Sequence, residues 1–251
     1  MSYIDTHTHL HFSQYRGRVD EVLHAAGEAG VVKHITVGTS SEDSRQAVQL
    51  AARYENVWAS VGVHPHSADE IDQAFSYVSD LAKERKVVAI GECGLDYFKT
   101  QAAPQQQERA LRRQLELAVE LNLPVIFHVR EAHQRFFEIL TDYKVRGVLH
   151  SFTAGESELR QALDYGLLIA LNGIMTFTKD EAQLMAAKQI PPSSLILETD
   201  CPFLSPHPYR GKENEPARLA DIAEFLAELR GEKLEILATQ TTRNAEELFG
   251  I

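Results

Sequence analysis

The sequence predicts a single (β/α)8 barrel, and three observations support this prediction. The chain has 251 residues, enough for eight strand–helix units. Short runs rich in Val, Ile and Leu alternate with amphipathic stretches along the whole sequence. Histidines and carboxylates directly follow several of these runs. In a barrel the carboxyl ends of all strands meet on one face, whereas an open doubly wound sheet would string such residues along one edge.

Eight apolar runs are expected to form strands that are buried on both faces of a parallel sheet. They are Tyr3–Asp5, Lys33–Val37, Val57–Val63, Val87–Ile90, Val125–Val129, Gly147–Leu149, Leu167–Leu171 and Leu195–Glu198.

Helical patterns separate these runs. Residues 19–26 place apolar side chains at the i, i+3, i+4, i+7 spacing of a buried stripe, and Pro104–Leu121 repeats the stripe as far as Val119. The last segment, Glu232–Phe249, is expected to form an extra helix pair outside the barrel. Because no linker or shift in composition marks a boundary, residues 1–251 are predicted to form one domain.

The composition is that of an ordinary soluble globular protein, with 44 % hydrophobic residues and a net charge of -11. Two cysteines are too few for a disulfide framework and fit a reducing compartment. The chain has no apolar run of membrane-spanning length, and its first residues lack the basic start of a signal peptide. We therefore expect a cytoplasmic protein without a membrane partner. The acidic charge argues against wrapping duplex DNA, but it leaves room for a site that grips one or two phosphates.

Six candidate metal ligands lie at the ends of the predicted strands, and they are His7, His9, Glu92, His128, His150 and Asp200. A single histidine after a strand is more often structural, but seven of the 11 histidines gather at strand ends. His7 and His9, two residues apart on a strand, point to the same face. Imidazoles and carboxylates favour Zn, Mn or Fe(II). Six ligands exceed the need of one tetrahedral ion and suffice for two ions that share a carboxylate.

The motifs around these residues resemble those of the TatD-type deoxyribonucleases, within the amidohydrolase superfamily. The matching segments are Asp5–Leu10, Gly91–Tyr97, His150–Thr153, Glu198–Pro202 and Tyr209–Pro216. The resemblance implies a divalent-metal hydrolase on a TIM barrel, with deoxyribonuclease activity. It further implies that His7, His9, Glu92 and Asp200 hold one ion and that Glu92, His128 and His150 hold the other. Glu92 would then be the bridge, where related two-metal hydrolases have a carboxylated lysine.

Other residues are candidates for substrate contacts. Asp200 is either a general base or only a metal ligand. Arg130, two residues beyond His128, is placed to bind a phosphate, and His64 points into the same mouth as a substrate contact or a support for a ligand. Arg210 and Lys212 follow the eighth strand, where barrels often bind phosphate, although Lys212 fits a solvated loop charge equally well.

A few further residues receive structural or weaker functional interpretations. The aromatic residues Tyr97, Phe98, Phe152 and Phe203 either stack an unpaired base or cap the core. Cys93 and Cys201 are expected to be small buried hydrophobic residues rather than ligands. Asn214 is expected to cap a helix over Ala217–Leu229, with Pro216 in its first turn. Because no Gly-rich phosphate loop follows a strand, we expect no nucleotide cofactor.

Three functional hypotheses follow. The first is a monomeric phosphodiesterase that uses two divalent metal ions (Zn, Mn or Mg) to trim DNA ends or short single strands as a 3′–5′ exonuclease. The second keeps the fold and the metals but hydrolyses a small-molecule ester or amide, or an aminoacyl ester. The third is a catalytically idle metal-binding or quality-control partner, which the complete set of six ligands disfavours.

Overall fold

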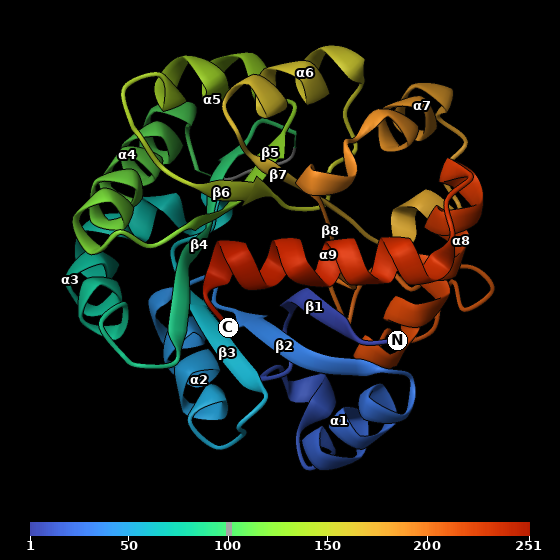
Figure 1. The fold of residues 1–251 in the computed structure, drawn as a ribbon. Helices are drawn as coiled ribbons and strands as arrows, with labels where there is room; N and C mark the ends of the chain where they lie inside the picture. The colour runs from blue at the N-terminus through green and yellow to red at the C-terminus, as the bar shows by residue number, and fades with distance from the viewer. Residues whose placement is uncertain (99–101) are drawn as a thin grey trace. The chain divides into compact units, whose positions relative to one another are not determined.

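The computed structural model describes residues 1–98 and 102–251 of the chain. Its strands are parallel where their pairing is given, and they follow one another in the order of the chain (Figure 1). The strands are β1 (Tyr3–Thr8), β2 (Val31–Val37), β3 (Val57–Val61), β4 (Val87–Asp96), β5 (Val125–Arg130), β6 (Gly147–Leu149), β7 (Leu168–Leu171) and β8 (Leu195–Leu197).

The end of the last strand lies beside the first strand. Thr8 forms a parallel bridge with Cys201, four residues beyond the end of β8. The backbone N–H of Asp200 donates to the carbonyl of His7 at 2.9 Å, and that of His9 donates to the carbonyl of Cys201 at 2.8 Å. Parallel strands in chain order, with the eighth adjoining the first, have the topology of a (β/α)8 barrel, so the predicted fold class is confirmed.

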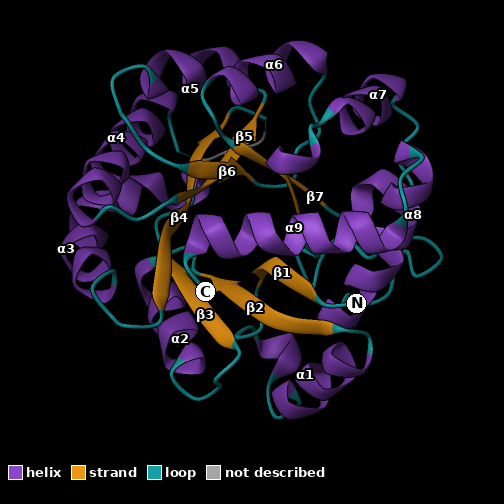
Figure 2. Cartoon of the chain, in the orientation of Figure 1, coloured by secondary structure: helices purple, strands orange, loops and turns teal. Residues whose placement is uncertain are grey.

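Helices alternate with the strands as far as β8, and the last two α-helices follow it (Figure 2). They are α1 (Val19–Glu28), α2 (Ser41–Ala51), α3 (Ile71–Leu81), α4 (Pro104–Leu121), α5 (His133–Leu140), α6 (Glu156–Asp164), α7 (Glu181–Gln189), α8 (Leu219–Arg230) and α9 (Leu234–Phe249). No helix of the described residues combines the length and apolar character that crossing a membrane requires.

Two details of the helices differ from the prediction. Val119 of α4 is 49 % exposed, because the buried face of the helix follows positions 107, 111, 114 and 118 and leaves position 119 at its edge. The C-terminal helix pair is present as α8 and α9, but segment 232–249 supplies only α9. Gly231, with φ of 66°, ends α8 immediately before that segment.

Of the strands that extend further than their apolar runs predict, β1 and β4 extend the most. β1 continues to Thr8, and β4 continues from Ile90 through six more buried residues to Asp96. The continuation of β4 pairs with β5, and a Cβ at Gly94 would overlap the carbonyl of His128. Only glycine permits this close approach, and it lets polar residues be carried on a strand that stays paired with β5 up to Asp96.

The chain packs as two compact units. Residues 1–36 and 151–251 form the first unit, and residues 37–150 form the second. Each unit carries one half of the strand series: β7, β8, β1 and almost all of β2 in the first, and β3 to β6 in the second. The prediction of one domain over residues 1–251 stays a prediction.

Buried glutamines of α4 form hydrogen bonds with backbone groups that follow or end strands in the second unit. The side chain of Gln114 accepts from the N–H of Val63 at 2.7 Å and donates to its carbonyl at 3.0 Å. Gln107 does the same for Asp96, at 2.8 and 2.9 Å. Both glutamines are fully buried, so they satisfy backbone groups that water cannot reach.

In the first unit, α9 covers the start of β1 and β8. Asn244 of α9 donates to the carbonyl of Leu195 at 2.8 Å, and Thr242 donates to that of Ser2 at 2.8 Å. Lys33 of β2 pairs with Glu246 at 2.7 Å. The C-terminal helix therefore closes the amino ends of these strands, opposite to the ends that carry His9 and Asp200.

The buried His34 of β2 makes the stability of the fold depend on pH. His34 is fully buried, and among the described residues neither ring nitrogen has a hydrogen-bond partner. Burial lowers its pKa from 6.5 to about 3. Below pH 6.5 the unfolded chain takes up a proton at His34 that the folded chain refuses, so stability present above pH 6.5 is lost as the pH falls towards 3.

We expect the wild type to lose about 1.5 kcal/mol more than His34→Leu between pH 6.5 and pH 5. Urea denaturation of both proteins at the two pH values measures this difference. Groups such as Asp5 titrate in both proteins, so their contributions to the pH dependence of stability cancel in the difference. Parallel pH profiles for the two proteins would show that His34 is not buried as a neutral ring.

Candidate functional site

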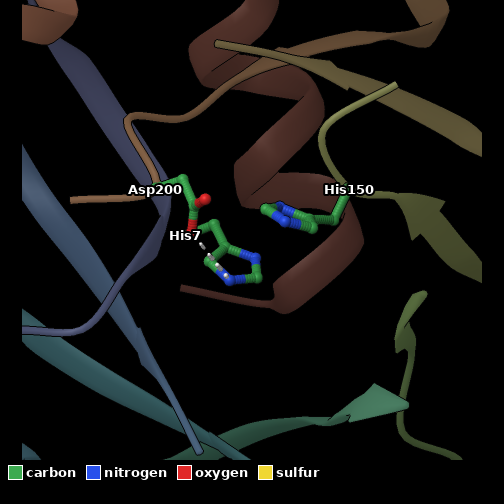
Figure 3. Close-up of side chains that lie close together, drawn as sticks. All are labelled: His7, His150 and Asp200. Atoms are coloured by element: carbon green, nitrogen blue, oxygen red, sulfur yellow. Dashed lines mark ion pairs between the residues drawn. The ribbon is translucent and has the colours of Figure 1, made fainter. Parts of the chain in front are cut away.

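The first donor cluster consists of His7, His9 and Asp200, all in the first unit. His7 lies in β1, and His9 follows two residues later on the same face. Their Nε2 atoms lie 3.6 and 3.4 Å from Oδ1 of Asp200 (Figure 3, which draws the pair of His7 and Asp200). Both histidines are buried, and the Asp200 side chain is 14 % exposed. The structure thus brings three of the six predicted ligands together.

The second donor cluster, in the second unit, surrounds Glu92 of β4. Oε1 of Glu92 lies 2.8 Å from Nδ1 of His128, 3.6 Å from Nε2 of His64 and 3.8 Å from Nε2 of His150. Donor atoms of Glu92, His128 and His64 all lie within 4.8 Å of one another, close enough to hold one metal ion. The remaining three predicted ligands therefore lie together, and His64 joins them.

Hydrogen bonds assign a proton to His64. Its Nδ1 accepts from the backbone N–H of His66 at 3.1 Å, so neutral His64 carries its proton on Nε2, the atom nearest Glu92. Burial lowers the pKa of His64 to about 3, which keeps the ring neutral. His64 is therefore arranged as a hydrogen-bond donor, which suits the predicted substrate contact better than a metal ligand.

Comparison with known proteins supports the resemblance seen in the sequence. The family model described as TatD related DNase matches residues 4–250. The chain belongs to this family. A protein of Klebsiella pneumoniae named 3′-5′ ssDNA/RNA exonuclease TatD is 40 % identical over 259 residues, covering 98 % of this chain and 97 % of the relative. An uncharacterized metal-dependent hydrolase, YabD, of Bacillus subtilis is 36 % identical over 251 residues and 98 % of each chain.

The fold agrees with that of the TatD family over the whole chain. The crystal structure of YJJV, a TatD homolog from Escherichia coli, superposes with a TM-score of 0.94 and 30 % identity, covering 99 % of this chain and 98 % of that one. The chain is thus a metal-dependent hydrolase of the TatD type. Family membership does not assign individual ligands, so the six metal-binding residues stay a prediction.

Two residues beside the second donor cluster of this TatD-type chain, Asp96 and His66, have no role in the prediction from the sequence. Oδ2 of Asp96 lies 3.1 Å from Nε2 of His128 and 3.0 Å from Nε2 of His66. Burial raises the pKa of Asp96, but hydrogen bonds from His128, His66 and the N–H of Phe98 outweigh it and hold the pKa well below its usual value. Strand periodicity could have found Asp96, since positions 92, 94 and 96 share one face.

Burial also lowers the pKa of His128, but its hydrogen bonds to Asp96 and Glu92 prevail and raise the pKa above the ordinary value. Both ring nitrogens of His128 therefore face carboxylate oxygens, Nδ1 towards Glu92 and Nε2 towards Asp96. This arrangement fixes the orientation of the ring. A carboxylate that fixes a ligating histidine in this way also raises its basicity.

Asp5 and Thr199 hold the first donor cluster in place. The N–H and the hydroxyl of Thr199 donate to the Asp5 carboxylate at 2.9 and 2.6 Å. Burial raises the pKa of Asp5 to about 8, although the hydrogen bonds from Thr199 and from the N–H of His7 lower it. These bonds tie β1 to the segment that carries Asp200.

Asn214 links the loops beside the first donor cluster, and its predicted role as a helix cap is wrong. Glu215 is the residue that precedes the short helix at Pro216, while Asn214 is fully buried. Its Nδ2 donates to the carbonyls of Thr199 at 3.0 Å and Phe203 at 2.6 Å, and its own carbonyl accepts from the hydroxyl of Tyr15 at 2.5 Å. Nothing in the local sequence shows whether Asn214 caps a helix or binds these distant backbone groups.

A third group of buried polar residues fixes the backbone after β6. Oε1 of Glu198 accepts from the N–H of Ser151 at 2.8 Å and from Nδ2 of Asn172 at 3.0 Å. Asn172 also donates to the hydroxyl of Ser151 at 2.9 Å. Ser151, which directly follows His150, has φ of 49° and is held in this conformation by the three bonds.

The predicted phosphate-binding cations are exposed. The guanidinium of Arg130 lies 3.9 Å from the ring centre of Phe98. In the first unit, the guanidinium of Arg210 lies 3.6 Å from the ring centre of Phe177, and Lys212 extends from the same loop. Stacking on an aromatic ring holds a guanidinium in place while its N–H groups stay available to a phosphate.

The aromatic and cysteine predictions have mixed outcomes. Phe152 is buried and belongs to the core, whereas Phe98 and Phe203 are exposed. Cys93 and Cys201 are free and fully buried, and burial raises the pKa of both thiols, which confirms them as small hydrophobic residues.

Replacing Asn214 by Ala is expected to lower the free energy of unfolding by about 1–3 kcal/mol, because two buried carbonyls lose their donor. Urea denaturation measures the change. Lys212→Ala, an exposed substitution in the same loop, is the control and should leave stability unchanged. Equal stability of both variants would contradict the linking role of Asn214.

Proposed function

We propose that this chain removes nucleotides one at a time from the 3′ ends of single-stranded DNA or RNA by hydrolysing phosphodiester bonds. The observation that carries the proposal is Glu92, a buried carboxylate with the nitrogens of His128, His64 and His150 around it. The named activity of the Klebsiella relative supports the choice of substrate.

The donor sets fit divalent cations. Imidazole nitrogens and carboxylate oxygens suit Zn and Mn, and Mg is an alternative. We propose that His7, His9, Glu92 and Asp200 hold one ion and that Glu92, His128 and His150 hold a second. Such cations would supply Lewis acidity, which makes a water molecule more acidic and neutralises charge on the phosphate.

Asp200 would accept the proton of the attacking water. Its carboxylate is partly exposed beside His7 and His9, so water reaches it, whereas Asp5 behind it is sealed by Thr199. A role as ligand alone is the alternative. His64 would donate its Nε2–H to an oxygen of the substrate.

Arg130, Arg210 and Lys212 would bind the phosphates of the strand. Each is exposed, and two of them are stacked on aromatic rings. The net charge of -11 disfavours long duplex DNA, so these local cations suit a few nucleotides of single strand. We propose that the chain acts as a monomer, and its two free thiols fit the reducing cytoplasm.

Replacing Glu92 by Gln is expected to lower activity by more than about 100-fold and to reduce the bound metal per chain. A 5′-labelled single-stranded oligonucleotide with Mg, Mn or Zn measures stepwise shortening, and elemental analysis measures the metal. Glu84→Gln, an exposed change in the same unit, is the control. Full activity of Glu92→Gln would overturn the shared-ligand role.

The same assay separates the functional hypotheses. If wild-type protein shortens no oligonucleotide with any of the metals but hydrolyses small esters or amides, the small-molecule hydrolase replaces the exonuclease. Absence of both activities in a protein that retains metal favours the idle binding partner.

Replacing Arg130 by Ala is expected to raise KM for the oligonucleotide about tenfold with little change in kcat, because a charged hydrogen bond to a phosphate is lost. Initial rates over a range of oligonucleotide concentrations measure both constants. Arg85→Ala, an exposed arginine of the same unit, should leave KM unchanged. A lowered kcat at constant KM would show that Arg130 acts on the reacting group instead.

A further inference from the structure

Two phenylalanines of the first unit, Phe12 and Phe203, lie beside the first donor cluster. The Phe12 ring is stacked on that of His9, with 4.6 Å between centres and an angle of 22°. Phe203 contacts both rings edge-on, at 5.9 Å from His9 and 6.1 Å from Phe12. Phe12 and Phe203 are 191 residues apart in the chain, so tertiary structure brings them together.

Phe203 is 47 % exposed, although its backbone is firmly fixed. Its N–H donates to the carbonyl of Asp200 at 2.9 Å, and its carbonyl accepts from the buried Asn214 at 2.6 Å. Single exposed apolar side chains are common and by themselves indicate nothing. Here hydrogen bonds to Asp200 and to the buried Asn214 fix the backbone of Phe203, and its ring is exposed to solvent beside the first donor cluster.

The same polar link positions Phe12. Tyr15, three residues further on, is fully buried, and its N–H donates to the carbonyl of Phe12 at 3.0 Å. The Tyr15 hydroxyl donates to the carbonyl of Asn214, the residue that holds Phe203. One buried pair, Tyr15 and Asn214, therefore fixes both aromatic residues.

The Phe203 ring is exposed and is not stacked face to face with His9 or Phe12. The plane of the Phe203 ring makes an angle of 66° with that of His9 and of 77° with that of Phe12, so neither ring covers Phe203 in a parallel stack. Phe98, the other exposed phenylalanine on a strand-end loop, differs because the guanidinium of Arg130 lies over its ring. Aromatic side chains in this position stack with nucleobases of single strands, whatever the base.

We propose that Phe203, backed by Phe12, is the stacking platform for one base of the nucleotide whose phosphate is held at the first donor cluster. The proposal rests on the proposed exonuclease function, and it assigns the recognition of one base of the substrate to Phe203. The loop after Phe203 carries the exposed Arg210 and Lys212, which would bind phosphates of the same strand. A platform of this kind requires an unpaired base.

The test uses 5′-labelled dT12 oligonucleotides in which one of the last three nucleotides is replaced by an abasic residue. In the wild type, the abasic residue at one of these positions should lower kcat/KM by about 5- to 150-fold, the range provided by one base–aromatic stack. Phe203→Ala should lower kcat/KM for intact dT12 by a similar factor and be insensitive to that abasic residue. Phe203→Trp should retain the wild-type pattern.

The control is Ile236→Ala, which removes an exposed apolar side chain of α9 at the far end of the same unit and should keep the wild-type pattern. Position-dependent sensitivity that persists in Phe203→Ala, or its absence in the wild type, would overturn the platform. If the wild type cleaves no oligonucleotide, the proposed function fails instead. Fluorescence anisotropy with the same oligonucleotides in EDTA then tests the platform without catalysis. A lower affinity of Phe203→Ala than of the wild type would support the platform, and equal affinities would overturn it.

Discussion

The structure depends on one constraint, which is that carboxylates buried at the ends of strands must be satisfied. Asp5, Glu92, Asp96 and Glu198 are at most 4 % exposed. An unpaired buried charge costs several kcal/mol, so each such group requires hydrogen bonds, a neutral form or a cation. Asp5 and Glu198 are satisfied by neighbouring donors of the chain, and Asp96 by two imidazoles. Glu92 has beside it the imidazoles of His128 and His150, which are predicted metal ligands, and it is therefore the carboxylate best suited to serve cations.

This constraint explains why the donors lie on strands and are supported by buried amides. A strand fixes side-chain direction at every second residue, which places Glu92 and Asp96 on one face without loop flexibility. Polar strand ends leave backbone groups without partners, and Gln107 and Gln114 supply them. Tyr15 and Asn214 perform the corresponding task in the first unit. The geometry of the two donor clusters thus depends on residues outside them, because precise placement of donor atoms needs a rigid backbone.

Much of the fold could be predicted from the sequence, because alternation of apolar runs and amphipathic stretches reflects burial directly. The prediction failed where polar residues are buried. The run Val87–Ile90 ends at the first glycine, although β4 continues to Asp96. The clustering of the six proposed ligands could be predicted, because their residue types gather at strand ends. The partners that orient them were not, since the link from Asn214 to Tyr15 spans 199 positions and leaves no local pattern. Asp96 lies between these extremes, because strand periodicity indicates the face on which it lies but not its contact with His128.

An acidic chain that binds nucleic acid needs an attraction other than net charge. With a charge of -11, long-range electrostatics repel a polyanion, so affinity must come from short-range contacts. Guanidinium groups stacked on Phe98 and Phe177 retain their charge while their conformational freedom is reduced. Stacking on a fixed aromatic ring adds attraction that does not depend on charge and that only an unpaired base can receive. In the proposed exonuclease, repulsion of long duplexes and stacking of single bases would act in the same direction, and together they would favour the free ends of single strands.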